Sequence, residues 1–197
     1  NNTLVMRSLG QLLHSVGRCR DSLEIVDRAL KIDPLAPDHH VRKALRLWVF
    51  DRIPEADRVS DRAMELWPSH RLVRMSRLMI YAFTGRTQAA LAMVEEEEAR
   101  PLLLSKSAAS VWRHSLTALA DPTPSAIASA RQANVEGARN TPAVAAWAIL
   151  TLSALGELDA AFDVANGFLL SRGSVIVRPQ RDGRPRRLNH AGYRNSF

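Results

Sequence analysis

Residues 9–34 read LGQLLHSVGRCRDSLEIVDRALKIDP, and residues 44–68 read ALRLWVFDRIPEADRVSDRAMELWP. The two stretches match at a fixed offset, which aligns Gly10 with Ala44 and Pro34 with Pro68. Two periods after Gly17, and one period after Asp51, the same place is taken by Gly85. An internal period of this length, about 34 residues, is typical of helical hairpins that stack side by side and share a core.

The local pattern within the repeat is helical. Leu9, Leu12, Leu13 and Val16 recur at the spacing of one helix face, and no convincing period-two alternation occurs between residues 1 and 171. Proline is tolerated at the first position of a helix, and three prolines stand where a helix of the repeat should begin: Pro54, Pro124 and Pro142. Thr123 and Thr141 precede two of them as N-cap candidates. The sequence therefore predicts an all-α fold.

Later copies of the repeat are looser but keep its register. Trp112 and Trp147 lie close to one period apart, and the interval from Gly85 to Gly156 fits two periods with a few extra residues near Asp121. We predict about five helical hairpins, over residues 3–34, 37–68, 70–100, 104–138 and 142–171. The tail, residues 172–197, carries many arginines, prolines and glycines and is predicted to be partly irregular.

Small residues recur where two antiparallel helices must approach closely. They include Ala44, Ala56, Ala63, Ala90 and Ala161. A single hairpin cannot bury its apolar face alone, so its neighbours must cover it.

Composition limits the classes of protein considered. The 197 residues are 46% hydrophobic and 24% charged, as in a soluble globular protein, and no run of about 18 apolar residues indicates a membrane span. With one cysteine, Cys19, no internal disulfide is possible, which favours a cytoplasmic location. The net charge of +7 favours anionic partners. Since Asn1 is not a methionine, we expect a processed or truncated piece of a longer chain.

These features resemble the tetratricopeptide repeat (TPR) family, with good specificity over residues 3–100 and moderate specificity over 104–171. The first copy shows the family pattern at Leu9, Gly10, Leu13, Gly17, Ser22, Val26, Ala29 and Pro34; the third keeps Tyr81, Gly85, Ala90 and Val94 but has Glu97 where a small residue is usual. The resemblance implies a right-handed α-α superhelix over residues 1–171, whose first helices line a concave groove for a peptide or a partner helix.

Under this alignment the groove is lined by first-helix residues: Arg7, Gln11, His14, Val41, Leu45, Trp48, Met75, Met79 and Ala82. The middle of this set is apolar and adaptable, which suits an amphipathic helix or an apolar peptide side chain. The alternative is that these residues pack against a neighbouring hairpin or a dimer partner. The family's clamp for a terminal carboxylate is not predicted, because Arg7, Gln11 and Arg42 occupy its positions without the expected asparagines.

Cationic residues at helical spacing suggest a basic stripe: Arg42, Arg46, Arg71, Arg74 and Arg77. Such a stripe attracts an acidic protein or the phosphates of a nucleic acid, whereas the alternative is an ordinary solvated face. The acidic run Glu95–Glu98 ends a second helix, where carboxylates oppose the helix dipole, so either pairing with basic neighbours or simple solvation is expected.

No catalytic, metal or cofactor motif is present in the sequence. Histidines such as His39, His40, His70 and His114 lack ligand spacing, and Cys19 lacks a nucleophile signature. We therefore predict a non-catalytic interaction scaffold without a cofactor. A weaker resemblance to TPR arrays behind bacterial winged-helix regulators leaves a second interpretation open, a nucleic-acid-associated regulatory module that uses the basic stripe or the tail.

Overall fold

The structure is a computed structural model that describes residues 2–99, 104–140 and 144–171. Within these residues it contains ten helices and no strand. The all-α prediction is confirmed. The N-terminus of the fifth predicted hairpin, with Thr141 and Pro142, lies outside the described residues, as does the tail from residue 172.

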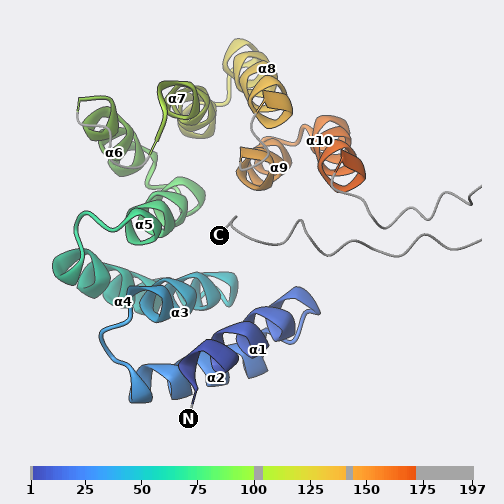
Figure 1. Ribbon diagram of the computed structural model, residues 1–197. Coiled ribbons are helices and arrows are strands. Elements are labelled where there is room, and N and C mark those ends of the chain that lie inside the picture. The colour runs from blue at the N-terminus through green and yellow to red at the C-terminus, as the bar shows by residue number, and fades with distance from the viewer. Residues whose placement is uncertain (1, 100–103, 141–143, 172–197) are drawn as a thin grey trace, which may run out of the picture. The chain divides into compact units, whose positions relative to one another are not determined.

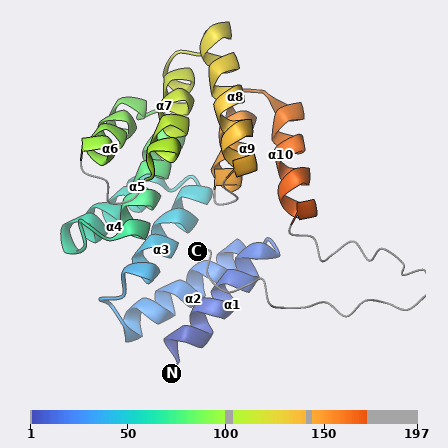
Figure 2. The same cartoon turned by 45° about the horizontal axis from the view of Figure 1, so that its top comes forward.

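Six helices form the first of two compact units, which ends at Leu103. They are α1 (Thr3–Ser15), α2 (Cys19–Ile32), α3 (Pro37–Val49), α4 (Ile53–Leu66), α5 (Arg71–Phe83) and α6 (Thr87–Ala99). They pair as α1 with α2, α3 with α4 and α5 with α6, while α2 packs on α3 and both α3 and α4 pack on α5 (Figures 1 and 2). Each hairpin thus rests on the one before it.

The second unit, from Leu104 onward, repeats this arrangement. Its helices are α7 (Lys106–Ala120), α8 (Pro124–Asn140), α9 (Ala145–Ala154) and α10 (Leu158–Ser171). The hairpin α7–α8 packs on α9–α10, mainly through α8. The sequence predicted one array over residues 1–171, whereas the structure contains two compact units of stacked hairpins.

One backbone conformation marks the turn inside four of the five hairpins. Gly17, Asp51, Gly85 and Gly156 have φ values of 80°, 58°, 76° and 79°, in the left-handed region that suits glycine. In each turn the next amide N–H donates to the carbonyl five residues back, as Arg18 does to Leu13 at 2.8 Å. The repeat is thus visible in the backbone as well as in the sequence.

The predicted small residues lie between helices, as expected. Ala56 is 0% exposed and packs with Ala44, Leu47 and Ile80 in a cluster that joins three helices of the first unit. Capping also follows the prediction at Thr123, whose Oγ1 accepts a hydrogen bond from Ala126 N at 3.3 Å at the start of α8.

Candidate partner-binding surface of the first unit

Polar side chains of α1 and α3, the first helices of two successive hairpins, contact each other at one edge of the first unit. Arg7 Nη1 lies 3.5 Å from Asp38 Oδ2, and Arg42 Nη1 donates to Gln11 Oε1 at 2.7 Å. Arg7 and Gln11 are exposed, while His14 and Arg42 are half-buried. The Nε of Arg42 is buried and has no hydrogen-bond partner among the described residues. This edge therefore carries an excess of positive charge and one unsatisfied donor.

Arg46, predicted to belong to an exposed stripe, is buried instead, with 3% exposed. Its guanidinium donates to Ser22 Oγ at 2.6 Å, to Gly10 O at 3.4 Å and to Arg42 O at 3.1 Å, which ties α3 to the first hairpin. Burial first, and then the Arg42 cation, lower the pKa of Arg46 to about 10, so it stays charged at neutral pH.

His14 lies beside this buried cation, with its Nδ1 3.6 Å from Cys19 Sγ. Burial is the main cause that lowers the pKa of His14, and the Arg46 and Arg42 cations lower it further. His14 is therefore neutral at pH 7 and offers a hydrogen bond rather than a charge.

The apolar residues predicted for the groove divide into two kinds. Val41 and Ala82 are buried, with 8% and 2% exposed, and Val41 packs with Ala63 and Val73 between hairpins. Their side chains are therefore not accessible to a ligand, and the packing of Val41 agrees with the alternative interpretation, contact with a neighbouring hairpin.

The other apolar residues of the set keep part of their surface. Leu45, Trp48, Met75 and Met79 are half-buried. Leu45 packs against core clusters, and the Trp48 ring stacks on Phe83 with 6.0 Å between centroids. Leu45 and Trp48 lie on α3 and are held in place by these contacts, while Met75 and Met79 lie on α5. We call the accessible residues of α1, α3 and α5 the first-helix surface: Arg7, Gln11, His14, Arg42, Leu45, Trp48, Met75 and Met79.

Arg74 of the predicted stripe also lies inside the unit, with 5% exposed. Its Nε donates to Glu97 Oε1 at 2.8 Å and its Nη2 to Glu96 Oε2 at 3.0 Å. Burial tends to lower the pKa of Arg74, but the hydrogen bonds to the two carboxylates outweigh it and raise the pKa. Pairing with Arg74 thus explains Glu96 and Glu97 of the acidic run, and Glu97 stands in place of the usual small residue opposite Arg74.

Arg77 completes a second buried network, with 7% exposed. It forms ion pairs with Asp57 at 2.9 Å and with Asp61, and Arg86 Nη1 reaches the other oxygen of Asp57 at 2.8 Å. Both guanidinium groups lie over the Tyr81 ring, with Arg77 Cζ 4.2 Å and Arg86 Cζ 4.9 Å from the ring centroid. These contacts hold α4, α5 and the start of α6 together.

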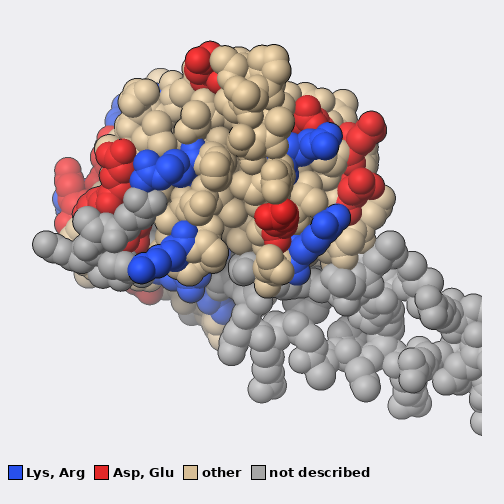
Figure 3. Space-filling view, turned by 90° about the horizontal axis from the view of Figure 1, so that it is seen from above, with Lys and Arg blue, Asp and Glu red and all other residues tan. Residues whose placement is uncertain are grey.

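The basic stripe therefore does not exist as one exposed band. Of the five arginines, Arg46, Arg74 and Arg77 are buried, Arg42 is half-buried and Arg71 is exposed. On the face shown in Figure 3, Lys and Arg side chains stand singly among acidic and uncharged residues. The helical spacing correctly predicted that Arg74 and Arg77 lie on one side of α5. That side faces the neighbouring helices α4 and α6 instead of solvent.

One recurring contact was not predicted. Lys43 Nζ pairs with Asp27 Oδ1 at 2.7 Å, and Arg77 pairs with Asp61, so an ion pair between α3 and α2 recurs one period later between α5 and α4. The sequence contained a signal for this contact, because a cation and an aspartate recur one period apart, as Lys43 and Arg77 and as Asp27 and Asp61. This position marks the face on which each hairpin meets the preceding one.

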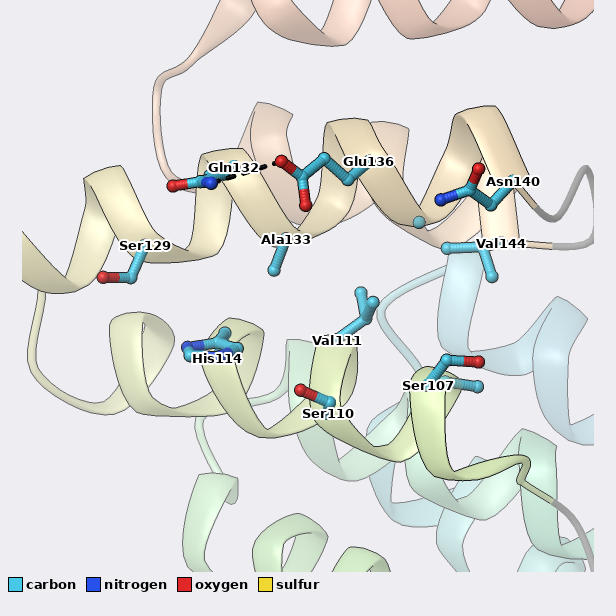
Figure 4. Close-up of a pocket in the computed structure, with 12 residues that line it drawn as sticks. Ser107, Ser110, Val111, His114, Ser129, Gln132, Ala133, Glu136, Asn140 and Val144 are labelled. Carbon is cyan, nitrogen blue, oxygen red and sulfur yellow. Dashed lines mark hydrogen bonds between the residues drawn. The ribbon is translucent and has the colours of Figure 1, made fainter.

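The second unit carries an open groove of about 430 Å³ between α7 and α8. Figure 4 shows Ser110 and His114 of α7 facing Ser129 and Gln132 of α8, with Gln132 hydrogen-bonded to Glu136 at 3.2 Å. Its lining is mostly of small residues. Among the described residues no cluster of three or more His, Cys, Asp or Glu side chains could hold a metal ion, and no helix is long and apolar enough to cross a membrane.

Comparison with known proteins supports the fold. No family model matches the sequence, and no curated protein matches it either. Two solved structures match with a TM-score of 0.50 and 15% identity: a MamA RS-1 ArsTM double mutant, with 86% of this chain and 94% of that chain covered, and residues 41 to the end of MamA from Desulfovibrio magneticus RS-1, with 88% and 97% covered. The fold is a TPR-like helical repeat. At so low a sequence identity the likeness shows the fold alone.

Proposed function

We propose that the first unit binds a segment of a partner protein, an extended peptide or an amphipathic helix, across the first-helix surface. One observation carries the proposal: two successive first helices, α3 and α5, present half-buried apolar side chains, and α1 and α3 carry a cationic edge. Leu45, Trp48 and Met79 are half-buried, and the first two are fixed from behind by core contacts and still have free area. Preorganised apolar side chains of this kind bind at a low entropic cost.

The cationic edge defines the chemistry of the ligand. Asp38 pairs with Arg7 and its charge also acts on Arg42, and the Arg42 Nε lacks an acceptor among the described residues. An acidic side chain or a backbone carbonyl of the ligand would satisfy that donor. We infer a ligand with apolar anchors at one end and an acidic residue at the other.

Selection of displayed peptides on the whole 197-residue chain, followed by affinity measurement, tests the proposal. Met79→Lys and Arg42→Glu should each weaken binding of the selected peptides by about 10-fold or more, since each removes a central contact. Arg28→Glu on α2 and Leu35→Lys between α2 and α3, both away from this surface, are the matched controls. Equal affinity for all four variants would place the site elsewhere.

Nothing in the described residues favours the nucleic-acid alternative. Its two supports were the basic stripe and the arginine-rich tail. Arg74 and Arg77 are engaged by carboxylates, and the tail lies outside the described residues. The role we propose is therefore protein binding.

A further inference from the structure

A groove of about 860 Å³ runs between α8 and α10, the second helices of the two hairpins in the second unit. The two helices contact each other and lie side by side (Figures 1 and 2). The lining residues of α8 recur at the spacing of one helix face from Ala128 to Arg139, and those of α10 do so from Asp159 to Phe168. The groove therefore extends for about three turns along both helices. We call it the α8–α10 groove.

The floor of the α8–α10 groove is apolar and fixed from behind. Val135 and Ala138 of α8 and Ala160 of α10 are half-buried and pack against the core cluster of the second unit. Val164 also lines the groove, belongs to that cluster and is 8% exposed. A ligand would thus contact apolar side chains that are already ordered, which lowers the entropic cost of binding.

Gly167 leaves open space along the α10 side of the groove. A Cβ atom added to Gly167 would meet no packing partner within 4 Å, whereas one added to Gly137 of α8 would lie 2.9 Å from a methyl carbon of Val111. Packing within the described residues therefore explains Gly137 but not Gly167. Glycine inside a helix is unfavourable relative to alanine, and close approach of a backbone to a ligand is one of its uses. The missing side chain at Gly167 lets a ligand come close to α10.

The two walls of the groove carry opposite charges. Exposed arginines line the α8 wall and exposed aspartates line the α10 wall: Arg131, Arg139, Asp159 and Asp163. Arg131 pairs at 3.6 Å with Glu157, which precedes α10. Arg139, Asp159 and Asp163 form no ion pair with another described residue. The charges of both walls therefore remain available to a ligand that lies between them.

One carboxylate interrupts the basic wall without reversing its charge. Glu136 of α8 accepts a hydrogen bond from Gln132 at 3.2 Å, and both residues also line the α7–α8 groove (Figure 4). They form the ridge that separates the two grooves. With two arginines against one glutamate, the α8 wall stays positive, while the α10 wall has aspartates alone.

We propose that the α8–α10 groove binds an amphipathic helix of a partner protein, with its apolar ridge on the floor, acidic residues toward α8 and basic residues toward α10. The floor favours a helix over an extended peptide, because α8 and α10 use their backbone groups internally and offer none to an extended backbone. A helical ligand satisfies its own backbone groups and needs only apolar anchors spaced at i, i+4 and i+7. This site is separate from the first-helix surface and goes beyond the function proposed above.

Three designed helical peptides of about 15 residues test the proposal on the whole chain, with affinity measured at low salt. All three carry the same leucine ridge. Their flanks are glutamate on one side and lysine on the other, glutamate on both sides, or lysine on both sides. The mixed peptide should bind about 5-fold more tightly than either uniform peptide, because each uniform peptide meets one wall of like charge. The net charge of +7 alone would instead favour the all-glutamate peptide.

Reversal of a wall charge should change the preferred peptide. Arg139→Glu makes both walls acidic, so the all-lysine peptide should become the tightest ligand. Arg28→Glu makes the same charge change on α2 of the first unit, and Met79→Lys blocks the first-helix surface, so both should leave the order of the three peptides unchanged. An unchanged order in Arg139→Glu would overturn the proposal. So would loss of binding in Met79→Lys, because the peptides would then bind the first-helix surface.

Gly167→Trp fills the groove from a position with open space. It should weaken binding of the mixed peptide by about 10-fold or more and leave the thermal unfolding midpoint unchanged or higher, since tryptophan favours a helix more than glycine does. A lower midpoint would show that part of the chain itself already occupies the groove, which would overturn the proposal. A wild-type chain that binds none of the three peptides, or all three equally, would overturn it as well.

Discussion

The buried ion pair between Arg74 and Glu97 allows a quantitative test of how the third hairpin departs from the first two. In the first repeat the corresponding residues are Met6 and Ala29. The double change Arg74→Met with Glu97→Ala therefore transplants the first repeat's own pair into the third. We expect the two single changes to be strongly destabilising and the double change to be mild.

The magnitudes follow from burial. The Arg74 and Glu97 side chains are 6% and 2% exposed, so removing one partner leaves a charge buried, which costs about 3–5 kcal/mol. For Glu97→Ala we expect the lower figure, about 3 kcal/mol, because Glu96 still pairs with Arg74 from a side chain that is 61% exposed. Replacing both ions by uncharged residues should cost about 1 kcal/mol or less.

Hydrogen exchange, detected by mass spectrometry on peptides from residues 71–99, measures the opening free energy of the third hairpin separately from the unfolding of the second unit. The single changes should lower the local opening free energy by amounts whose sum exceeds that of the double change by at least about 3 kcal/mol. If the single effects simply add, the pair is not coupled and the explanation of the acidic run fails.

Three further predictions test the packing, the turns and the titrating groups. Ala56→Leu should destabilise the first unit by about 1–3 kcal/mol in urea unfolding, because the 0% exposed site has no room, and an unchanged midpoint would contradict close helix approach there. Asp51→Gly should stabilise the second hairpin and Gly85→Ala should destabilise the third by about 1 kcal/mol, since both positions have positive φ; effects of the opposite sign would refute the turn assignment. Burial is the main cause that lowers the pKa values of His14 and His39, so the unfolded chain binds more protons than the folded chain near pH 6.5. Stability should therefore fall as the pH drops from 7 to 5, and changing both histidines to Gln should flatten this dependence in thermal unfolding. An equally steep loss in the double variant would show that these histidines do not cause it.

The fold could be predicted from the sequence because its determinants are local and repeated. Gly17 and Gly85 each end a first helix in the left-handed conformation, and Ala44 and Ala56 mark a close helix contact, so the sequence period alone gives the hairpins. For the acidic run the sequence left two alternatives open, pairing with basic neighbours and simple solvation, and the structure shows pairing for Glu96 and Glu97.

The side-chain environment of the arginines could not be predicted in the same way. Spacing places Arg74 and Arg77 on one side of α5, but whether that side meets water or another helix depends on carboxylates 16 to 23 residues away. The same limit applies to Val41 and Ala82, because a groove-facing position and a position between hairpins have the same apolar character.

Nuclear magnetic resonance of the methionine methyl groups tests the proposed binding surface most directly, because the chain contains only five methionines. Met75 and Met79 lie on α5 within the first-helix surface, while Met64 on α4 and Met93 on α6 serve as internal controls. Titration of a selected peptide should shift the Met75 and Met79 signals and leave those of Met64 and Met93 in place. Saturable binding that moves only the Met64 and Met93 signals would contradict the assignment of the site to the first helices.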